Sequence, residues 1–142
     1  MIRAQRVVDL ALAEARRLGG ADETTVLVTE RVDAALRWAN NTMTTNGESS
    51  SRTTTVISIV RQGDKARVGT VCSSSVEPTV IADLVAASQQ AATAAPYARD
   101  GAAPLPGGDS PVDWEDAISG TGVDVFAGVA RGLVQGFRGS DT

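Results

Sequence analysis

The chain contains no histidine, and Cys72 is its single cysteine. Without histidine, the chain cannot form a histidine acid or base, a Ser-His or Cys-His dyad, or the common zinc centres. A single cysteine excludes an internal disulfide and a thiolate cluster, and it is consistent with a reducing compartment. We expect Cys72 to be a small buried hydrophobic side chain at a strand end. The sequence therefore holds no catalytic constellation, and we expect no metal or other cofactor to be bound by this chain alone.

Aromatic residues make up only 4% of the chain, although 42% of its residues are hydrophobic. The core must therefore be built from aliphatic side chains and alanine. No apolar run is long enough to span a bilayer. The N-terminal stretch "MIRAQRVVDLALAEARR" is interrupted by polar residues, so it predicts an amphipathic helix and not a signal peptide. We therefore expect a cytoplasmic protein without a membrane partner.

The net charge of −4 is distributed unevenly along the chain. Residues 1–72 hold ten Lys and Arg against eight Asp and Glu, whereas residues 73–142 hold three against nine. No basic cluster is dense enough to follow a phosphate backbone, so direct binding of nucleic acid is not expected.

Hydrophobic periodicity predicts an α+β fold of one helix, an antiparallel sheet of about four strands, and a second helix packed on that sheet. In the first helix, over residues 4–18, the apolar stripe runs through Val8, Ala11, Ala15 and Leu18, and Val7, Leu10 and Leu12 widen it. Gly19-Gly20 ends the helix. The second helix runs over 77–95 and has Pro78 in its first turn. The predicted strands cover residues 24–31, 33–40, 52–60 and 65–72, with Gly63 and Asp64 at the tip of a hairpin.

Residues 96–119 are rich in proline and glycine and predict a linker between an N-terminal domain, 1–95, and the start of a second, truncated domain, 120–142. A third helix is expected from about Thr121, which lies three residues before Asp124 in a weak version of a capping box. Its apolar stripe, Val123, Phe126, Ala130, Leu133 and Phe137, has nothing after it in the chain to cover it. This stripe predicts either a missing partner or a helix that packs within the chain.

Three stretches carry a resemblance to a known family: "LGGADETTVLVTERVDAALRWANNTMTTNG", "TTVISIVRQGDKARVGTVCSSS" and "AAPYARDGAAPLP". Together with the order of elements over residues 4–106, they resemble the N-terminal region of the TldD/PmbA (TldE) family, whose members are also called modulators of DNA gyrase. The form of "LRWANN" is closer to the PmbA/TldE side of the family.

The resemblance implies a cytoplasmic, oligomeric protein that acts in proteolysis. TldD-type subunits resemble zinc metallopeptidases with an HExxxH-type motif in a later segment, and their TldE-type partners lack that motif. Together they degrade or trim unfolded or precursor peptides. Zinc is thus implied for the catalytic members only. This sequence ends before such a motif would occur, so no catalytic or metal-binding residue is transferred to it, and the parent could be the hydrolase or its inactive partner.

One polar stretch, "LRWANNTMTTNG", allows two interpretations. If the neighbouring strands leave an open edge, that edge can add an extended peptide by main-chain hydrogen bonds. The side chains that would then contribute to peptide binding are Arg37, Asn40, Asn41 and Asn46. The alternative is a plain hairpin in which Leu36 and Trp38 are core residues and Arg37 faces solvent.

Two functions follow from these patterns. The chain is either the N-terminal part of a TldD/PmbA-like metallopeptidase-family subunit, supplying scaffold and subunit contacts, or a stand-alone noncatalytic binding or regulatory module. The third helix separates the two. The first predicts that its face of Phe126, Leu133 and Phe137 is exposed or paired with another copy of the chain, and the second predicts that this helix packs on the chain's own sheet.

Overall fold

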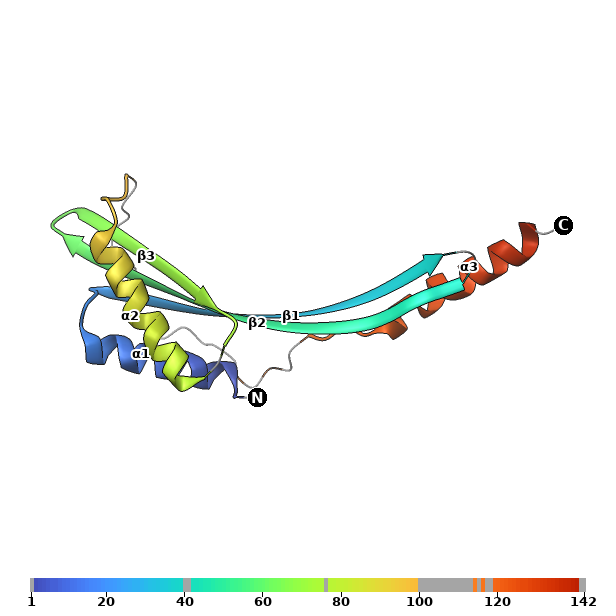
Figure 1. Cartoon of the computed structure of the whole chain (residues 1–142), viewed down its shortest axis with the longest axis horizontal. Helices are drawn as coiled ribbons and strands as arrows, with labels where there is room; N and C mark the ends of the chain where they lie inside the picture. Colours follow the sequence, from blue (N-terminus) through green and yellow to red (C-terminus); the bar gives the residue numbers. More distant parts are fainter. Residues whose placement is uncertain are drawn as a thin grey trace. The chain divides into compact units, whose positions relative to one another are not determined.

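The computed structural model describes residues 2–39, 42–75, 77–99, 114, 116 and 119–140. The elements follow in the order α1 (Ala4–Leu18), β1 (Glu23–Ala39), β2 (Thr42–Gln62), β3 (Lys65–Ser73), α2 (Pro78–Ala94), the short 3-10 helix η1 (Val123–Phe126) and α3 (Ala127–Ser140). This order confirms the predicted α+β class, in which an N-terminal helix is followed by an antiparallel sheet, a helix packed on that sheet and a C-terminal helix (Figure 1).

The three strands form one sheet in the order β1-β2-β3. β2 pairs antiparallel with β3 from Thr54 opposite Ser73 to Gln62 opposite Lys65, and the two residues between them close the hairpin. Gly63 has φ +62°, a left-handed conformation that glycine adopts without strain. The sheet has three strands where the sequence predicted about four, because the first two predicted strands form one continuous strand, β1.

Residues of the chain cluster into two compact units. The first comprises Met1–Thr29 and Arg52–Asp116, and the second comprises Glu30–Ser51 and Ala117–Thr142. β1 and β2 each contribute residues to both units. Most of the predicted linker, 96–119, lies outside the described residues, so the predicted domain boundaries stay a prediction.

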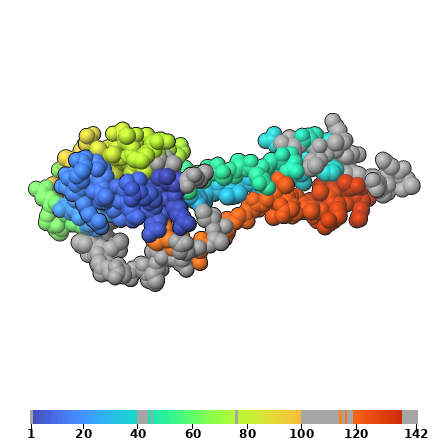
Figure 2. All heavy atoms as spheres, turned by 90° about the horizontal axis from the view of Figure 1, so that it is seen from below, coloured from blue at the N-terminus to red at the C-terminus, as the bar shows by residue number. Residues whose placement is uncertain are grey.

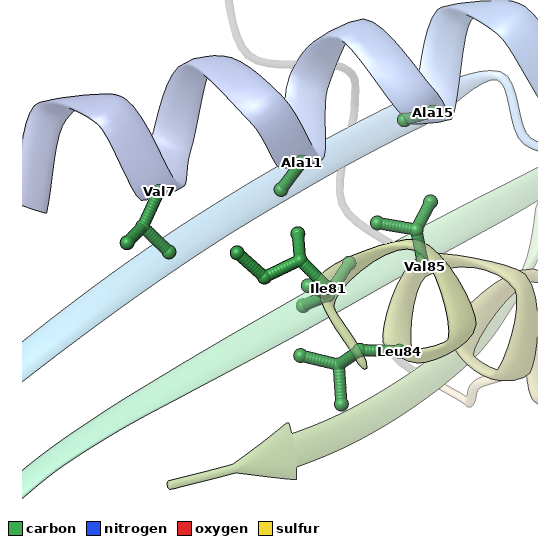
Figure 3. Packing of buried hydrophobic residues seen from close by; sticks show 7 residues of the cluster. Val7, Ala11, Ala15, Ile81, Leu84 and Val85 are labelled. Carbon is green, nitrogen blue, oxygen red and sulfur yellow. The ribbon is translucent and has the colours of Figure 1, made fainter. Parts of the chain in front are cut away.

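In the first unit, α1 and α2 pack side by side on one face of the sheet (Figures 1 and 2). Their buried residues form an aliphatic core with Val56 of β2, as the scarcity of aromatics required (Figure 3). The core consists of Val7, Ala11, Ala15, Val56, Ile81, Leu84 and Val85.

The boundaries of α1 match the predicted helix, and Gly19 takes the left-handed conformation at its C-terminal end with φ 62°. The predicted apolar face is confirmed at Ala11 and Ala15, and its centre lies at Val7, which is fully buried, whereas Val8 is half-buried. The prediction was wrong at Leu18, which is 38% exposed. Val7, Ala11 and Ala15 recur every four residues, and this spacing keeps them on the side of the helix that faces α2 and the sheet.

Small residues let α2 approach the sheet closely. A Cβ atom at Gly69 of β3 would lie 2.2 Å from both the backbone nitrogen of Ala92 and the carbonyl oxygen of Ser88. Beside this contact, the hydroxyls of Ser58 and Ser88 form a fully buried hydrogen bond of 2.7 Å. The helix therefore rests directly on the backbone of β3. The Ser88 hydroxyl donates to the carbonyl oxygen of Val85 at 2.8 Å and accepts from Ser58, so both buried hydroxyls are hydrogen-bonded.

Gln89 of α2 joins the two helices. Its side-chain nitrogen donates to the carbonyl oxygen of Ala15 at 3.3 Å, and its Oε1 accepts from the backbone N–H of Gly20 at 3.1 Å. One buried amide thus gives the Gly20 N–H an acceptor and gives the Ala15 carbonyl a second donor beside the Gly19 N–H, which lies 3.0 Å from it. Gly20 also has no room for a side chain, since an added Cβ would lie 2.4 Å from Oε1 of Gln89.

Candidate functional site: the ribbon edge in the second unit

The second unit contains the distal halves of β1 and β2, which form a two-stranded ribbon, together with η1 and α3. We define this ribbon as residues 30–39 of β1 and 42–51 of β2. Figure 2 shows α3, in orange to red, lying along it. Two of the four predicted peptide-binding side chains, Arg37 and Asn46, lie on the ribbon and are exposed. The other two, Asn40 and Asn41, lie outside the described residues.

One strand of the ribbon has an open backbone edge. β3 pairs only with Thr54–Gln62 of β2, and no other described strand pairs with β2 on that side. Residues 42–51 of β2 therefore pair with β1 but with no third strand among the described residues. From Asn46 to Ser51 every side chain is exposed.

The open edge lacks the features that usually block strand addition. Natural edge strands are protected by lysine, other charges, proline or bulges. Within residues 42–51 Glu48 is the single charged residue, and the segment has no proline; the others are threonine, serine, asparagine, methionine and glycine. By contrast, the paired half of β1 contains Glu30, Arg31, Asp33 and Arg37. The charges of the ribbon therefore lie mainly on the strand opposite the open edge.

Side chains fix the two strands and the helix of this unit. The Thr44 hydroxyl donates to the carbonyl oxygen of Arg37 at 3.3 Å. Glu48 Oε1 accepts the backbone N–H of Val123 at 3.0 Å, so a carboxylate of β2 satisfies an N–H at the start of the helical segment. The sequence pointed instead to Thr121 and Asp124 as the residues at this helix start, and a strand residue 75 positions away could not be identified from spacing alone.

Arg31 and Asp33 form an ion pair on β1. Arg31 Nε lies 2.9 Å from Oδ1 and 2.8 Å from Oδ2 of the Asp33 carboxylate. This hydrogen bonding lowers the pKa of Asp33 and raises the pKa of Arg31. Two residues apart on a strand share one face, so the sequence did contain the signal for this pair.

The two interpretations of "LRWANNTMTTNG" can be compared with side-chain burial. Leu36 and Trp38 are half-buried, whereas Ala35, Arg37 and Ala39 are exposed, which is the alternation expected of a strand with one packed face. This burial fits the plain hairpin for the β1 half of the stretch. It does not test the open edge on β2, because a strand can bury one face and still present unpaired backbone groups at its side.

The apolar stripe of the third helix is partly covered. Phe126, Ala130 and Leu133 are half-buried within the second unit, whereas Val125 and Val129 on the neighbouring face are 59% and 58% exposed. The side chain of Phe137 lies outside the described residues. The helix therefore packs within the chain along part of its predicted stripe.

The family resemblance implies zinc for catalytic members, but the described residues of this chain contain no set of side chains that could hold it. Among the described residues, no three His, Cys, Asp or Glu side chains gather, and Cys72 is exposed. This exposure also corrects the expectation of a buried cysteine at a strand end. Three acidic residues lie close together in the sequence at positions 113, 115 and 116, and two of them, Asp113 and Glu115, lie outside the described residues. No helix in the described part is long and apolar enough to cross a membrane.

The chain is similar in structure to TldE from Thermococcus kodakarensis. The match has a TM-score of 0.58 and 22% sequence identity, and it covers 90% of this chain and 28% of the TldE chain. This chain thus spans little more than a quarter of the length of that protein. No family model and no curated protein matches the sequence. The match confirms, at the level of the fold, the resemblance to the TldD/PmbA family.

Proposed function

We propose that this chain is part of a TldE-like subunit of a metallopeptidase system that handles unfolded or precursor peptides. The observation that carries the proposal is the combination of the TldE fold with an open and almost uncharged edge on β2. In this proposal the first unit supplies scaffold, the protein works in the cytoplasm, and it associates with a TldD-like or a second TldE-like subunit. The hydrolytic zinc site belongs to another part of the assembly.

The role of the ribbon is to hold an extended peptide by strand addition. Main-chain hydrogen bonds to residues 42–51 of β2 do not depend on the sequence of the peptide, and this tolerance suits a protein that receives unfolded chains. Arg37 and Asn46 are exposed on the two strands of the ribbon and adjust affinity through their side chains. Asn40 and Asn41 are assigned the same role on sequence grounds.

The test uses the 142-residue chain and an eight-residue unstructured peptide that carries a fluorophore, with binding followed by fluorescence anisotropy. In a strand, alternate N–H groups point to opposite sides. Two further peptides therefore carry N-methyl groups on alternate residues, one in each phase. We expect one phase to abolish binding and the other to bind as the parent peptide does. A scrambled sequence of the same composition is the control, and it should bind with nearly unchanged affinity.

Equal binding by both methylated peptides would contradict strand addition, because it would show that the peptide backbone makes no one-sided contact. Binding that disappears on scrambling would also contradict it, since it would reveal side-chain recognition. Arg37→Ala and Asn46→Ala should each weaken binding several-fold. Thr25→Ala, an exposed change on β1 in the first unit, is the matched variant that should leave it unchanged.

A second candidate function is a stand-alone binding or regulatory module. One observation favours it: the predicted stripe of the third helix is partly buried within its own unit, as a complete module requires. Sedimentation equilibrium separates the two candidates. A module that acts alone stays monomeric in the presence of a TldD-type subunit, whereas the TldE-like role predicts a stable complex.

A further inference from the structure

A small cavity lies in the first unit, at the end of the β2–β3 hairpin and beside the C-terminal end of α2. Its volume is about 260 Å³. Pockets for drug-sized ligands span roughly 300–1,000 Å³, so this cavity suits a ligand or terminal group of about one amino-acid residue. The residues that line it are Val60, Arg61, Gln62, Arg67, Thr93 and Tyr97.

Arg67 is held in place inside this cavity. Its Nη1 donates to the carbonyl oxygen of Thr93 at 2.8 Å, and the guanidinium carbon lies 4.5 Å from the centroid of the Tyr97 ring. Tyr97 is fixed in turn, because its hydroxyl bonds to Gln62 and the next residue donates its N–H to the carbonyl of Ala66 at 2.8 Å. A guanidinium stacked and anchored in this way loses little conformational entropy when a ligand binds.

Two of the residues that line the cavity are charged, Arg61 and Arg67. Arg61 is paired with Glu23, and its backbone N–H donates to the Asp22 carboxylate. Lys65 Nζ lies 5.2 Å from the centroid of the Tyr97 ring. In the described part of the chain, neither Lys65 nor Arg67 has a carboxylate partner.

Arg67 has donors to spare. Thr93 takes one of the five N–H groups of its guanidinium, and no bond from Nε or Nη2 is found within the described residues. An arginine fork matches the two oxygens of a carboxylate better than it matches a single point charge. The same side chain also stabilises the C-terminal end of α2, whose last turn contains no basic residue.

We propose that this cavity binds a carboxylate, with the Arg67 fork as its main ligand and Lys65 as the second cation. The carboxylate comes either from a small carboxylic acid or from the C-terminus of a peptide, and both present the same planar group. The inference stands on the cavity alone and does not depend on the proposed function of the ribbon, which uses other residues.

The experiment titrates the 142-residue chain, labelled with ¹⁵N, with three probes: acetate, N-acetyl-alanyl-alanine and the C-terminal amide of the same dipeptide. Backbone amides of Arg67 and Thr93 and the Arg67 Nε signal report binding. We expect saturable shifts with a Kd on the order of 1 mM for a single charge-assisted fork. The amide should bind at least about tenfold more weakly than the free acid. Tighter binding of the dipeptide than of acetate would assign the site to peptide C-termini, and equal binding would assign it to small acids.

Inorganic phosphate is a fourth probe. If it binds as tightly as the carboxylic acids do, the proposal that the cavity selects carboxylates is overturned. Arg67→Lys keeps the positive charge at the end of α2 but removes the forked guanidinium. It should therefore lower the affinity for the two carboxylic acids at least about fivefold, while the melting temperature of the protein changes little. Arg16→Lys, an exposed change on α1 outside the cavity, should leave affinity unchanged. The proposal is overturned if no saturable shift appears, if the amide binds as well as the acid, or if Arg67→Lys binds the acids unchanged.

Discussion

The close crossing of α2 over β3 makes Gly69→Ala the sharpest test of how the first unit is packed. The added Cβ would lie 2.2 Å from two backbone atoms of α2 and 2.8 Å from a third, the carbonyl carbon of Ala91. Backbone atoms cannot rotate away as a flexible side chain can, so the helix must lift from the sheet.

Two costs follow from that displacement. Overpacking a tight interior typically costs about 1–3 kcal/mol. If the helix lifts far enough to stretch the buried Ser58–Ser88 hydrogen bond, roughly 1 kcal/mol more is lost. We therefore expect the free energy of unfolding to fall by about 2–4 kcal/mol, because the two costs arise together.

Urea unfolding followed by far-UV circular dichroism measures the effect. With an m-value of about 1.5 kcal/mol/M, the midpoint should fall by roughly 1–3 M. Gly47→Ala is the matched control, since it adds the same methyl group to a strand position where no heavy atom lies within 4 Å. That variant should change stability by less than about 0.5 kcal/mol. A loss of less than about 0.5 kcal/mol for Gly69→Ala would refute the close crossing of α2 over β3.

Three further predictions address other contacts. Gln89→Leu removes both bonds to the end of α1, so it should cost about 1–3 kcal/mol in urea unfolding and accelerate hydrogen exchange of the Gly20 amide; unchanged exchange would contradict the role of Gln89. Glu48→Ala removes the acceptor at Val123, so amides at the start of the helical segment should exchange faster by a factor that corresponds to about 0.5–2 kcal/mol, while Ser50→Ala should leave them unchanged. Arg31→Gln should raise the pKa of Asp33 towards its ordinary value in an NMR titration. Because Arg31 lowers the folded-state pKa of Asp33, the pair stabilises the fold above the ordinary aspartate pKa, and that contribution is lost as the pH falls through the folded-state pKa.

Local patterns were sufficient to predict much of the first unit. Periodicity and end signals identified these elements: Gly19 marked the end of α1, Pro78 marked the start of α2, and Gly63 marked the tip of the hairpin. The alternation of Leu36 and Trp38 with exposed neighbours was also visible in the sequence. Each of these signals acts within a few residues, which is why a single sequence contains them.

Contacts between distant residues were not predictable. Periodicity placed both Val7 and Val8 on the broad apolar face of α1, and it could not tell which of them is the more buried, because that depends on where α2 and the sheet lie. The sequence pattern divided residues 24–40 into two strands at Val32, whereas β1 continues through Val32 without a break. Glu48 and Gln89 cap helix ends 75 and 69 positions away, and only the tertiary fold brings those partners together.

The candidate site was predictable only in part. The polar composition of residues 42–51 was plain in the sequence, but the open edge depends on β3 ending opposite Thr54, which no local pattern indicates. The carboxylate cavity was not foreseen, since Arg67 and Tyr97 come together only when the segment after α2 returns to the start of β3.

Nuclear Overhauser contacts between a bound peptide and the labelled chain test the central claim most directly. With an unstructured eight-residue peptide at saturation, strand addition predicts contacts between the peptide backbone and residues 42–51 of β2. It also predicts slowed exchange of alternate β2 amides in that segment. Contacts confined to other residues, or peptide binding that leaves the exchange of every β2 amide unchanged, would contradict the assignment of the ribbon edge as the peptide site.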